Sequence, residues 1–153
     1  MTAPIQLSRK KAAKKPDVRW EALNQFCAFA EPASLTPVQR AAHAAYWYAS
    51  LVEAGGHHEY FAHVPRPDHD EVLAALRAIG ASELATILAA ARSAVSAASS
   101  RAPEEYADRY LAGVEFADFD EFDQAFERCS RPVAACLIDY VDKHESDFIE
   151  WKP

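Results

Sequence analysis

Apolar residues recur at the spacing of an α-helix along most of this 153-residue chain, and no other feature constrains the fold as strongly. Apolar side chains three and four positions apart give a helix one apolar face, which must be buried against other helices. No stretch alternates apolar and polar residues as a half-buried strand would. The length suits one domain. The sequence therefore predicts a single compact all-α domain of about seven helices.

Capping residues and glycines mark where these helices begin and end. Thr36 followed by Pro37 is the strongest start signal, because threonine caps a helix and proline suits its first turn. The helix that follows should stop at Gly55 and Gly56, where a left-handed residue needs no Cβ. The residues 97–100, rich in Ala and Ser, are predicted to be a fraying end or a loop. The predicted helices and one short helical stretch (57–63) span approximately residues 17–31, 36–54, 57–63, 69–79, 82–96, 103–111, 119–128 and 132–144.

Charge is distributed unevenly along the chain. The formal net charge is −7, yet residues 1–19 hold six basic residues and one acid, whereas residues 103–153 hold fourteen acids and five bases. Residues 1–16 contain few large apolar side chains and are predicted to be a disordered, flexible basic tail. Residues 17–153 then form the acidic helical domain, which should repel nucleic acid and anionic membranes and attract basic partners.

Neither the N-terminus nor the cysteines indicate an exported protein. The first residues are polar and basic rather than apolar as in a secretory signal, and no apolar run reaches the roughly 18 residues of a membrane span. Cys27, Cys129 and Cys136 are an odd number without CxxC spacing, which is typical of reduced cysteines in a cytoplasmic protein. The sequence lacks a P-loop, a dinucleotide-binding motif and a nucleophile elbow. We therefore expect a cytoplasmic binding protein that is not an enzyme and needs no cofactor.

Two motifs resemble those of a known family. Residues 51–61 read LVEAGGHHEYF, and residues 74–81 read AALRAIGA. Together they resemble the bacterial DNA-mimic-protein domain family, in which a helix ends in a glutamate and Asn-Gly-Gly precedes a short aromatic helix. A leucine-rich helix then closes on Ile-Gly-Ala. Ala54 replaces the usual asparagine here, and Glu59 replaces the usual glutamine. The resemblance covers roughly residues 34–150, with later aromatic and acidic residues (119–123, 126, 140–141 and 148) following the family's C-terminal pattern.

The resemblance implies an acidic, helical and homodimeric protein whose carboxylates imitate DNA phosphates. Such a protein sequesters a DNA-binding protein, typically a transcription factor, and its acidic domain does not bind nucleic acid itself. Carboxylates three or four positions apart on a helix lie about 5–6 Å apart, so a helix can present a ladder of negative charge. The candidate partner-binding residues form one cluster at Asp118, Asp120, Glu121, Asp123 and Glu127, and a second on the preceding helix at Glu104, Glu105 and Asp108. These acids also fit the solvated faces of ordinary amphipathic helices.

Two other functions suit the same sequence. A small acidic protein can neutralise a basic toxin in the manner of an immunity protein or antitoxin. A metal-dependent enzyme built on Glu59, His63 and His69 is the third hypothesis, although the offset from His58 to His63 is one residue too long to place both rings on one helix face. No metal site is therefore predicted.

The basic segment Arg9–Lys15 leaves three alternatives open. It could be a solubilising extension, bind nucleic acid, or fold back over an acidic patch of its own domain. It contains no aromatic residue, so base stacking is not indicated.

Overall fold

The computed structural model describes residues 4–64 and 68–153, and within them nine α-helices accompany one short 3-10 helix and two short strands. The prediction of an all-α domain is confirmed. In chain order the elements are β1 (Ile5–Ser8), α1 (Arg9–Lys14), α2 (Val18–Phe29), η1 (Pro32–Ser34), α3 (Pro37–His63), α4 (His69–Ala78), α5 (Ser82–Arg101), α6 (Arg109–Phe116), α7 (Asp120–Glu127), α8 (Val133–Lys143), α9 (Glu145–Phe148) and β2 (Ile149–Lys152).

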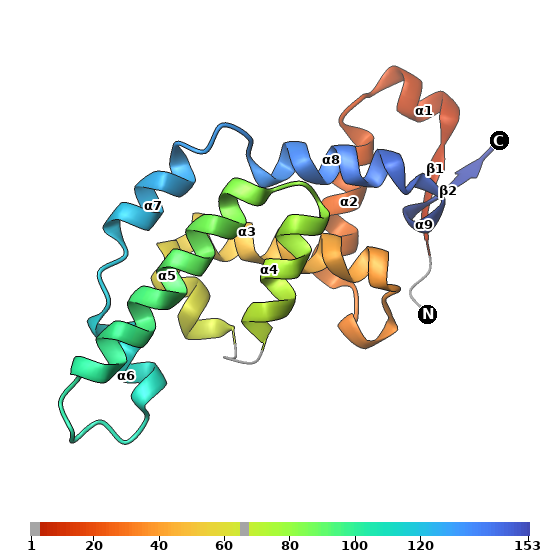
Figure 1. The fold of residues 1–153 in the computed structure, drawn as a ribbon. Helices are drawn as coiled ribbons and strands as arrows, with labels where there is room; N and C mark the ends of the chain where they lie inside the picture. The colour runs from red at the N-terminus through yellow and green to blue at the C-terminus, as the bar shows by residue number, and fades with distance from the viewer. Residues whose placement is uncertain (1–3, 65–67) are drawn as a thin grey trace.

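Helix α3 is the centre of the fold. It packs against α2, α4, α6, α7, α8 and α9, and Figure 1 shows these helices arranged around it. Its N-terminus is fixed by the predicted cap: Thr36 Oγ1 accepts from the Gln39 backbone N–H, and Gln39 Oε1 accepts from the Thr36 N–H. The Gln39 side-chain amide also donates to the backbone carbonyl of Asp147, 2.7 Å away. This capping box therefore joins the start of the central helix to the C-terminal part of the chain.

The N-terminal segment differs from the flexible tail that the sequence predicts. Within the described residues, β1 pairs in parallel with β2, with Ile5 opposite Ile149 and Ser8 opposite Lys152. Leu7 is only 7% exposed and belongs to the core. The strand escapes detection in the sequence because it is four residues long and its partner follows far along the chain. Residues 1–3 of the predicted tail lie outside the described residues.

Two helix boundaries also differ from the sequence prediction. Helix α5 continues through the Ala- and Ser-rich residues 97–100 to Arg101, and residues 103–108 form a loop rather than the start of a helix. Asp108 ends this loop, because its carboxylate accepts from the Leu111 N–H and caps α6. The Arg109 guanidinium donates to the carbonyls of Ser99, Ala102 and Pro103, so it satisfies acceptors that the end of α5 leaves open.

The remaining expectations concern the cysteines and the membrane. All three cysteines are free, and Cys27 and Cys136 are buried. Burial raises the pKa of the Cys27 thiol to about 12, which keeps it protonated and unreactive. Among the residues that the structure describes, none of the helices combines the length and the apolar character that crossing a membrane requires.

Helices α5 and α6 approach closely at Gly113, which allows a test of the packing. A Cβ at this position would lie 2.5 Å from the Val95 carbonyl oxygen and 2.9 Å from Ser99 Cβ. Helix propensity alone favours alanine over glycine by about 1 kcal/mol. We expect Gly113→Ala nevertheless to lower the free energy of unfolding by about 2 kcal/mol, because the backbone of α5 cannot give way cheaply. Urea denaturation measures this, and a stabilised variant would contradict the described helix contact.

Candidate acidic surface on helix α7

Helix α7 presents the first predicted acid cluster at one end of the molecule. In Figure 1 it lies far from both termini, beyond the end of α8. Its apolar side faces the protein, where Phe122 and Phe126 are partly buried and the preceding Phe119 is 6% exposed. The side chains on the other side of the helix and just before it are exposed, and we call them the acidic surface: Asp118, Asp120, Glu121 and Glu127.

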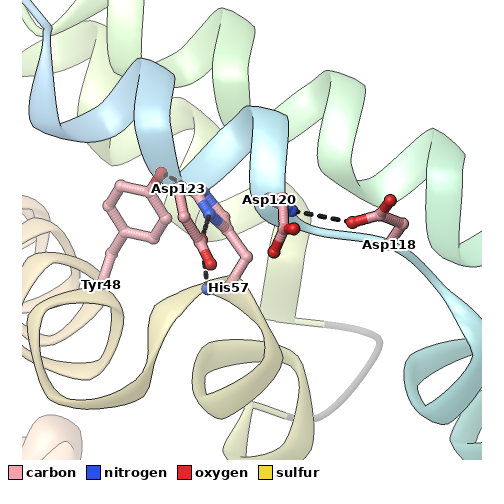
Figure 2. A network of polar contacts seen from close by, with 5 residues as sticks. All are labelled: Tyr48, His57, Asp118, Asp120 and Asp123. Atoms are coloured by element: carbon pink, nitrogen blue, oxygen red, sulfur yellow. Dashed lines mark hydrogen bonds and ion pairs between the residues drawn. The ribbon is translucent and has the colours of Figure 1, made fainter.

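The start of α7 is fixed by one of these acids. Asp118 Oδ1 accepts a hydrogen bond from the Asp120 backbone N–H at 3.0 Å. Figure 2 shows Asp118 and Asp120 together at the beginning of the helix. Because the amide dipoles of a helix favour negative charge at its N-terminus, acids in this first turn also stabilise α7.

Asp123 plays a different part from the rest of the predicted cluster. Its Oδ1 atom accepts from the backbone N–H of His57 at 2.8 Å and lies 2.6 Å from the ring Nδ1 of the same residue. Figure 2 shows its carboxylate directed at His57, in contrast to Asp118 and Asp120. Asp123 thereby caps, from another helix, the part of α3 that begins after the glycine pair. It is an anchor between α7 and α3, and its side chain is only 35% exposed.

The glycine pair makes this contact possible. The backbone of α3 is non-helical at Gly55 and Gly56, and Gly56 has φ 72° and ψ −172°, a combination that residues with a Cβ almost never adopt. A Cβ on Gly56 would overlap with Asp123 Oδ2 and lie 2.9 Å from the Asp123 carboxyl carbon. The interruption that the sequence predicts between two helical segments is therefore confirmed, and its purpose is to let the carboxylate of α7 reach the backbone of α3.

His57 continues the contact into the core. Its ring nitrogen Nε2 lies 3.0 Å from the Tyr48 hydroxyl, so Nδ1–H donates to Asp123 and the Tyr48 hydroxyl donates to Nε2 when the ring is neutral. His57 has no exposed surface, and Tyr48 is 1% exposed. Burial lowers the pKa of His57 below its ordinary value of 6.5, while the hydrogen bond and charge of Asp123 act in the opposite direction. The ring is therefore neutral at pH 7.

The fold adds an acid that the sequence did not single out. Glu53 of α3 lines the same hollow as Asp123 and Glu127, together with the glycine pair, in a cavity of about 330 Å³. Glu53 precedes α7 by almost half the chain, and no periodicity links the two segments. The sequence did contain a signal for this residue, because Glu53 lies two positions before the glycine pair.

The second predicted cluster does not lie on a helix. Glu104 and Glu105 are exposed in the loop between α5 and α6, and Asp108 is the cap of α6. The prediction of a helix beginning at Pro103 is wrong because the Asp108 cap and the Arg109 hydrogen bonds start the helix later. These three acids therefore lack the helical spacing that the sequence prediction assigned to them.

Several acids elsewhere are neutralised by arginine, whereas those of the acidic surface are not. Asp142 and Glu145 both bridge Arg19, Asp139 bridges Arg131, and Asp70 bridges Arg92. Within residues 4–64 and 68–153, no ion pair is formed by Asp118, Asp120, Glu121 or Glu127. The nearby Arg128 donates instead to the Gln124 amide oxygen. The negative charge of the acidic surface is therefore left for solvent or a partner.

The histidine-rich segment does not form the metal site of the third hypothesis. His63 is exposed and lies 3.3 Å from Glu59, whereas His69 is buried with its two ring nitrogens 3.0 and 2.9 Å from the hydroxyls of Tyr60 and Tyr110. In the part of the chain that the structure describes, no three metal-ligating side chains come together. Within these residues, Glu59, His63 and His69 therefore do not form the set of metal ligands that the hypothesis requires.

The fold and this surface define a class: a small helical protein with a solvent-facing acidic surface that no basic side chain of the described residues neutralises. Comparison with known proteins then gives the family. The family model described as DMP19-like protein matches residues 33–144, and the chain belongs to this family of DNA-mimic proteins, as the resemblance implied. No curated protein and no solved structure matched the chain. The match includes α3 to α8 and hence the acidic surface, while β1, α1, α2, α9 and β2 lie outside it.

The close approach of Asp123 predicts the effect of a methyl group at Gly56. We expect Gly56→Ala to lower the free energy of unfolding by about 3 kcal/mol, because the variant adds a clash with Asp123 Oδ2 to the backbone strain. Gly80 is the matched control, since it also has a positive φ of 83° but no atom within 4 Å of a Cβ. Gly80→Ala should cost only about 1–2 kcal/mol. Equal losses in chemical denaturation would show that the carboxylate contact contributes nothing.

The lowered pKa of His57 predicts a dependence of stability on pH. As the pH falls through 6.5, the unfolded chain takes up a proton at His57 before the folded chain does, so the free energy of unfolding decreases. We expect this decrease to be smaller in His57→Asn, whose amide can still donate to Asp123 but does not titrate. Identical slopes for the two proteins between pH 7.5 and pH 5.5 would rule out His57 as the source.

Proposed function

We propose that this protein is a regulator that binds another protein and sequesters it by imitating DNA. Its partner is a DNA-binding protein such as a transcription factor, and the acidic surface on α7 takes the place of the DNA. The observation that carries the proposal is the set of exposed carboxylates that no basic side chain neutralises within the described residues, in a chain of the DNA-mimic family.

The spacing of these carboxylates suits the proposal. A B-DNA strand carries one negative charge per 3.4 Å of axis, and its partners contact it largely through lysine and arginine. Asp120 and Glu127 lie two turns apart on α7, which is about 10 Å, and Asp118 and Glu121 place further charge beside the first turn. Glu53 continues the negative charge across the hollow onto α3.

The anchor at Asp123 supports the same function indirectly. An interaction surface binds more tightly when its groups are already held in place, because less freedom is lost on binding. The two contacts to His57 hold α7 against the central helix, so its exposed acids are presented by a fixed backbone. Asp123 is therefore assigned to positioning, and Asp118, Asp120, Glu121 and Glu127 to contact with the partner.

Burial argues for binding rather than catalysis. Tyr48, His57 and Asp123 form a chain of hydrogen bonds of the kind that activates a nucleophile. The Tyr48 and His57 side chains are 1% and 0% exposed, however, so a substrate has no access to them. The network instead supports the shape of the acidic surface. The homodimer that the family resemblance implies stays a prediction, which sedimentation equilibrium can test.

Capture from a native lysate at low salt tests the proposal. We expect the wild-type protein to retain a DNA-binding protein that competing duplex DNA releases. The variant Asp120→Asn/Glu121→Gln/Glu127→Gln should lose at least about 90% of the capture, because several charge-assisted contacts of about 1–3 kcal/mol each are removed. Asp123 is left unchanged so that α7 stays anchored.

The matched control changes three exposed acids elsewhere. Asp17→Asn/Glu21→Gln/Glu31→Gln removes the same charge from the region of α2 and should leave capture intact. If both variants lose the same share of the captured partner, the net charge of the protein and not the acidic surface explains the capture. A retained partner that resists high salt and is not displaced by DNA would contradict DNA mimicry and favour the immunity-type function.

A further inference from the structure

The elements outside the family match form a second unit at the other end of the molecule. Helix α1 precedes α2, and β1 pairs with β2 beside it. Figure 1 shows α1 and both strands near the two termini, while α7 lies at the opposite end. The basic segment therefore does not fold back over the acidic surface of its own chain. Whatever it contacts is not α7 of the same molecule.

Helix α1 exposes an organised row of lysines. Lys10 and Lys14 are one turn apart on one side of the helix, with Lys11 next to them. Lys15 follows directly after the helix, where its backbone N–H donates to the Lys11 carbonyl. All four are exposed, whereas Ala12 is half-buried and lines the groove between α1, α2 and α8. None of the four lysines forms an ion pair with any residue that the structure describes. We call this set the lysine surface.

Neighbouring contacts fix the helix and occupy two of the nearby acids. The Arg9 guanidinium lies over the Trp151 ring at 5.1 Å from its centroid, which ties the start of α1 to β2. Arg19 bridges Asp142 at 2.8 Å and Glu145 at 3.1 Å. These two acids are therefore neutralised by Arg19. Two other exposed acids lie near the lysines, because Asp17 follows Lys15 closely and Glu21 lines a hollow with Lys11. Neither forms an ion pair with a lysine within the described residues, and the four lysines outnumber them. The exposed Lys152 lies opposite Ser8 in the strand pair and adds a fifth positive charge next to α1.

We infer that the lysine surface binds the phosphate backbone of duplex DNA. Lysine binds phosphate as a compact point charge, and contacts of this kind need no base recognition. A protein partner fits less well, because protein interfaces have an apolar core and α1 exposes only lysine, arginine and alanine. A membrane fits less well because this six-residue helix has no large apolar side chain to insert.

The negative net charge of the protein does not prevent this binding. Exposed charges are screened beyond about 8–10 Å at physiological ionic strength, and the unneutralised acids of α7 lie at the far end of the molecule (Figure 1). A duplex at α1 therefore experiences the lysines rather than the acidic surface. One chain would thus hold DNA at one end and take the place of DNA at the other, and the two activities are separable.

Fluorescence anisotropy with a labelled duplex of about 20 base pairs tests the inference on the full-length protein. Four phosphate contacts should make the affinity fall about a hundredfold between about 50 and 200 mM salt. We expect Lys10→Gln/Lys11→Gln/Lys14→Gln to bind at least tenfold more weakly at the lower salt and to show a shallower salt dependence. Circular dichroism of each variant establishes that the fold is retained.

Two controls separate the lysine surface from other effects. Arg77→Gln/Arg101→Gln/Lys143→Gln changes three exposed cations elsewhere and should bind duplex DNA within about twofold of wild type. The α7 triple variant should also keep its duplex affinity, so a failure of the proposed function leaves this inference standing. No duplex binding at low salt, or equal losses in both cation variants, would overturn it. So would salt-sensitive self-association through these lysines without duplex binding, because their partner would then be a second copy.

Discussion

The arrangement of the acidic surface depends on one carboxylate that bridges two helices. Asp123 accepts from the backbone and the ring of His57 through the same oxygen, and the glycine pair clears the space for it. The phenylalanines of α7 turn its apolar side toward the core and its acids toward solvent. The hydrogen-bonded carboxylate adds a directed contact that holds the helix in this orientation. The acidic surface is thus held in place by a member of the cluster that is turned inward.

The distribution of arginines is as informative as that of the acids. The protein has enough basic side chains to neutralise many of its carboxylates, and it uses them selectively: Arg19, Arg92 and Arg131 form ion pairs. Arg109 donates to backbone carbonyls at and just after the end of α5, and Arg128 donates to the side-chain amide oxygen of Gln124. Exposed ion pairs add little stability on their own. Their main effect here is on the field around the protein, which they reduce near the C-terminal helices and leave strong around α7.

The sequence predicted those features that depend on neighbouring residues. The Thr36 cap, the interruption at Gly55 and Gly56, and the extents of α7 and α8 follow from local signals, and the structure confirms them. Features that depend on distant residues were missed. The start of α6 depends on Arg109 bonding backward to α5, and the role of Asp123 depends on His57, 66 positions earlier. On a helical wheel Asp123 looks like its exposed neighbours, because only the tertiary fold places a glycine turn in front of it.

The strand pair between β1 and β2 has a consequence for how the molecule forms. Ile5 and Ile149 can meet only when almost the whole chain between them is in place, so their pairing closes one of the longest loops the chain allows. Closing so long a loop costs entropy that four residues of strand cannot offset alone. The helical body must therefore fold first and bring the two ends together. A chain still being synthesised would have its central helices before β2 existed, and α1 would be fixed in place only after the last strand had been made.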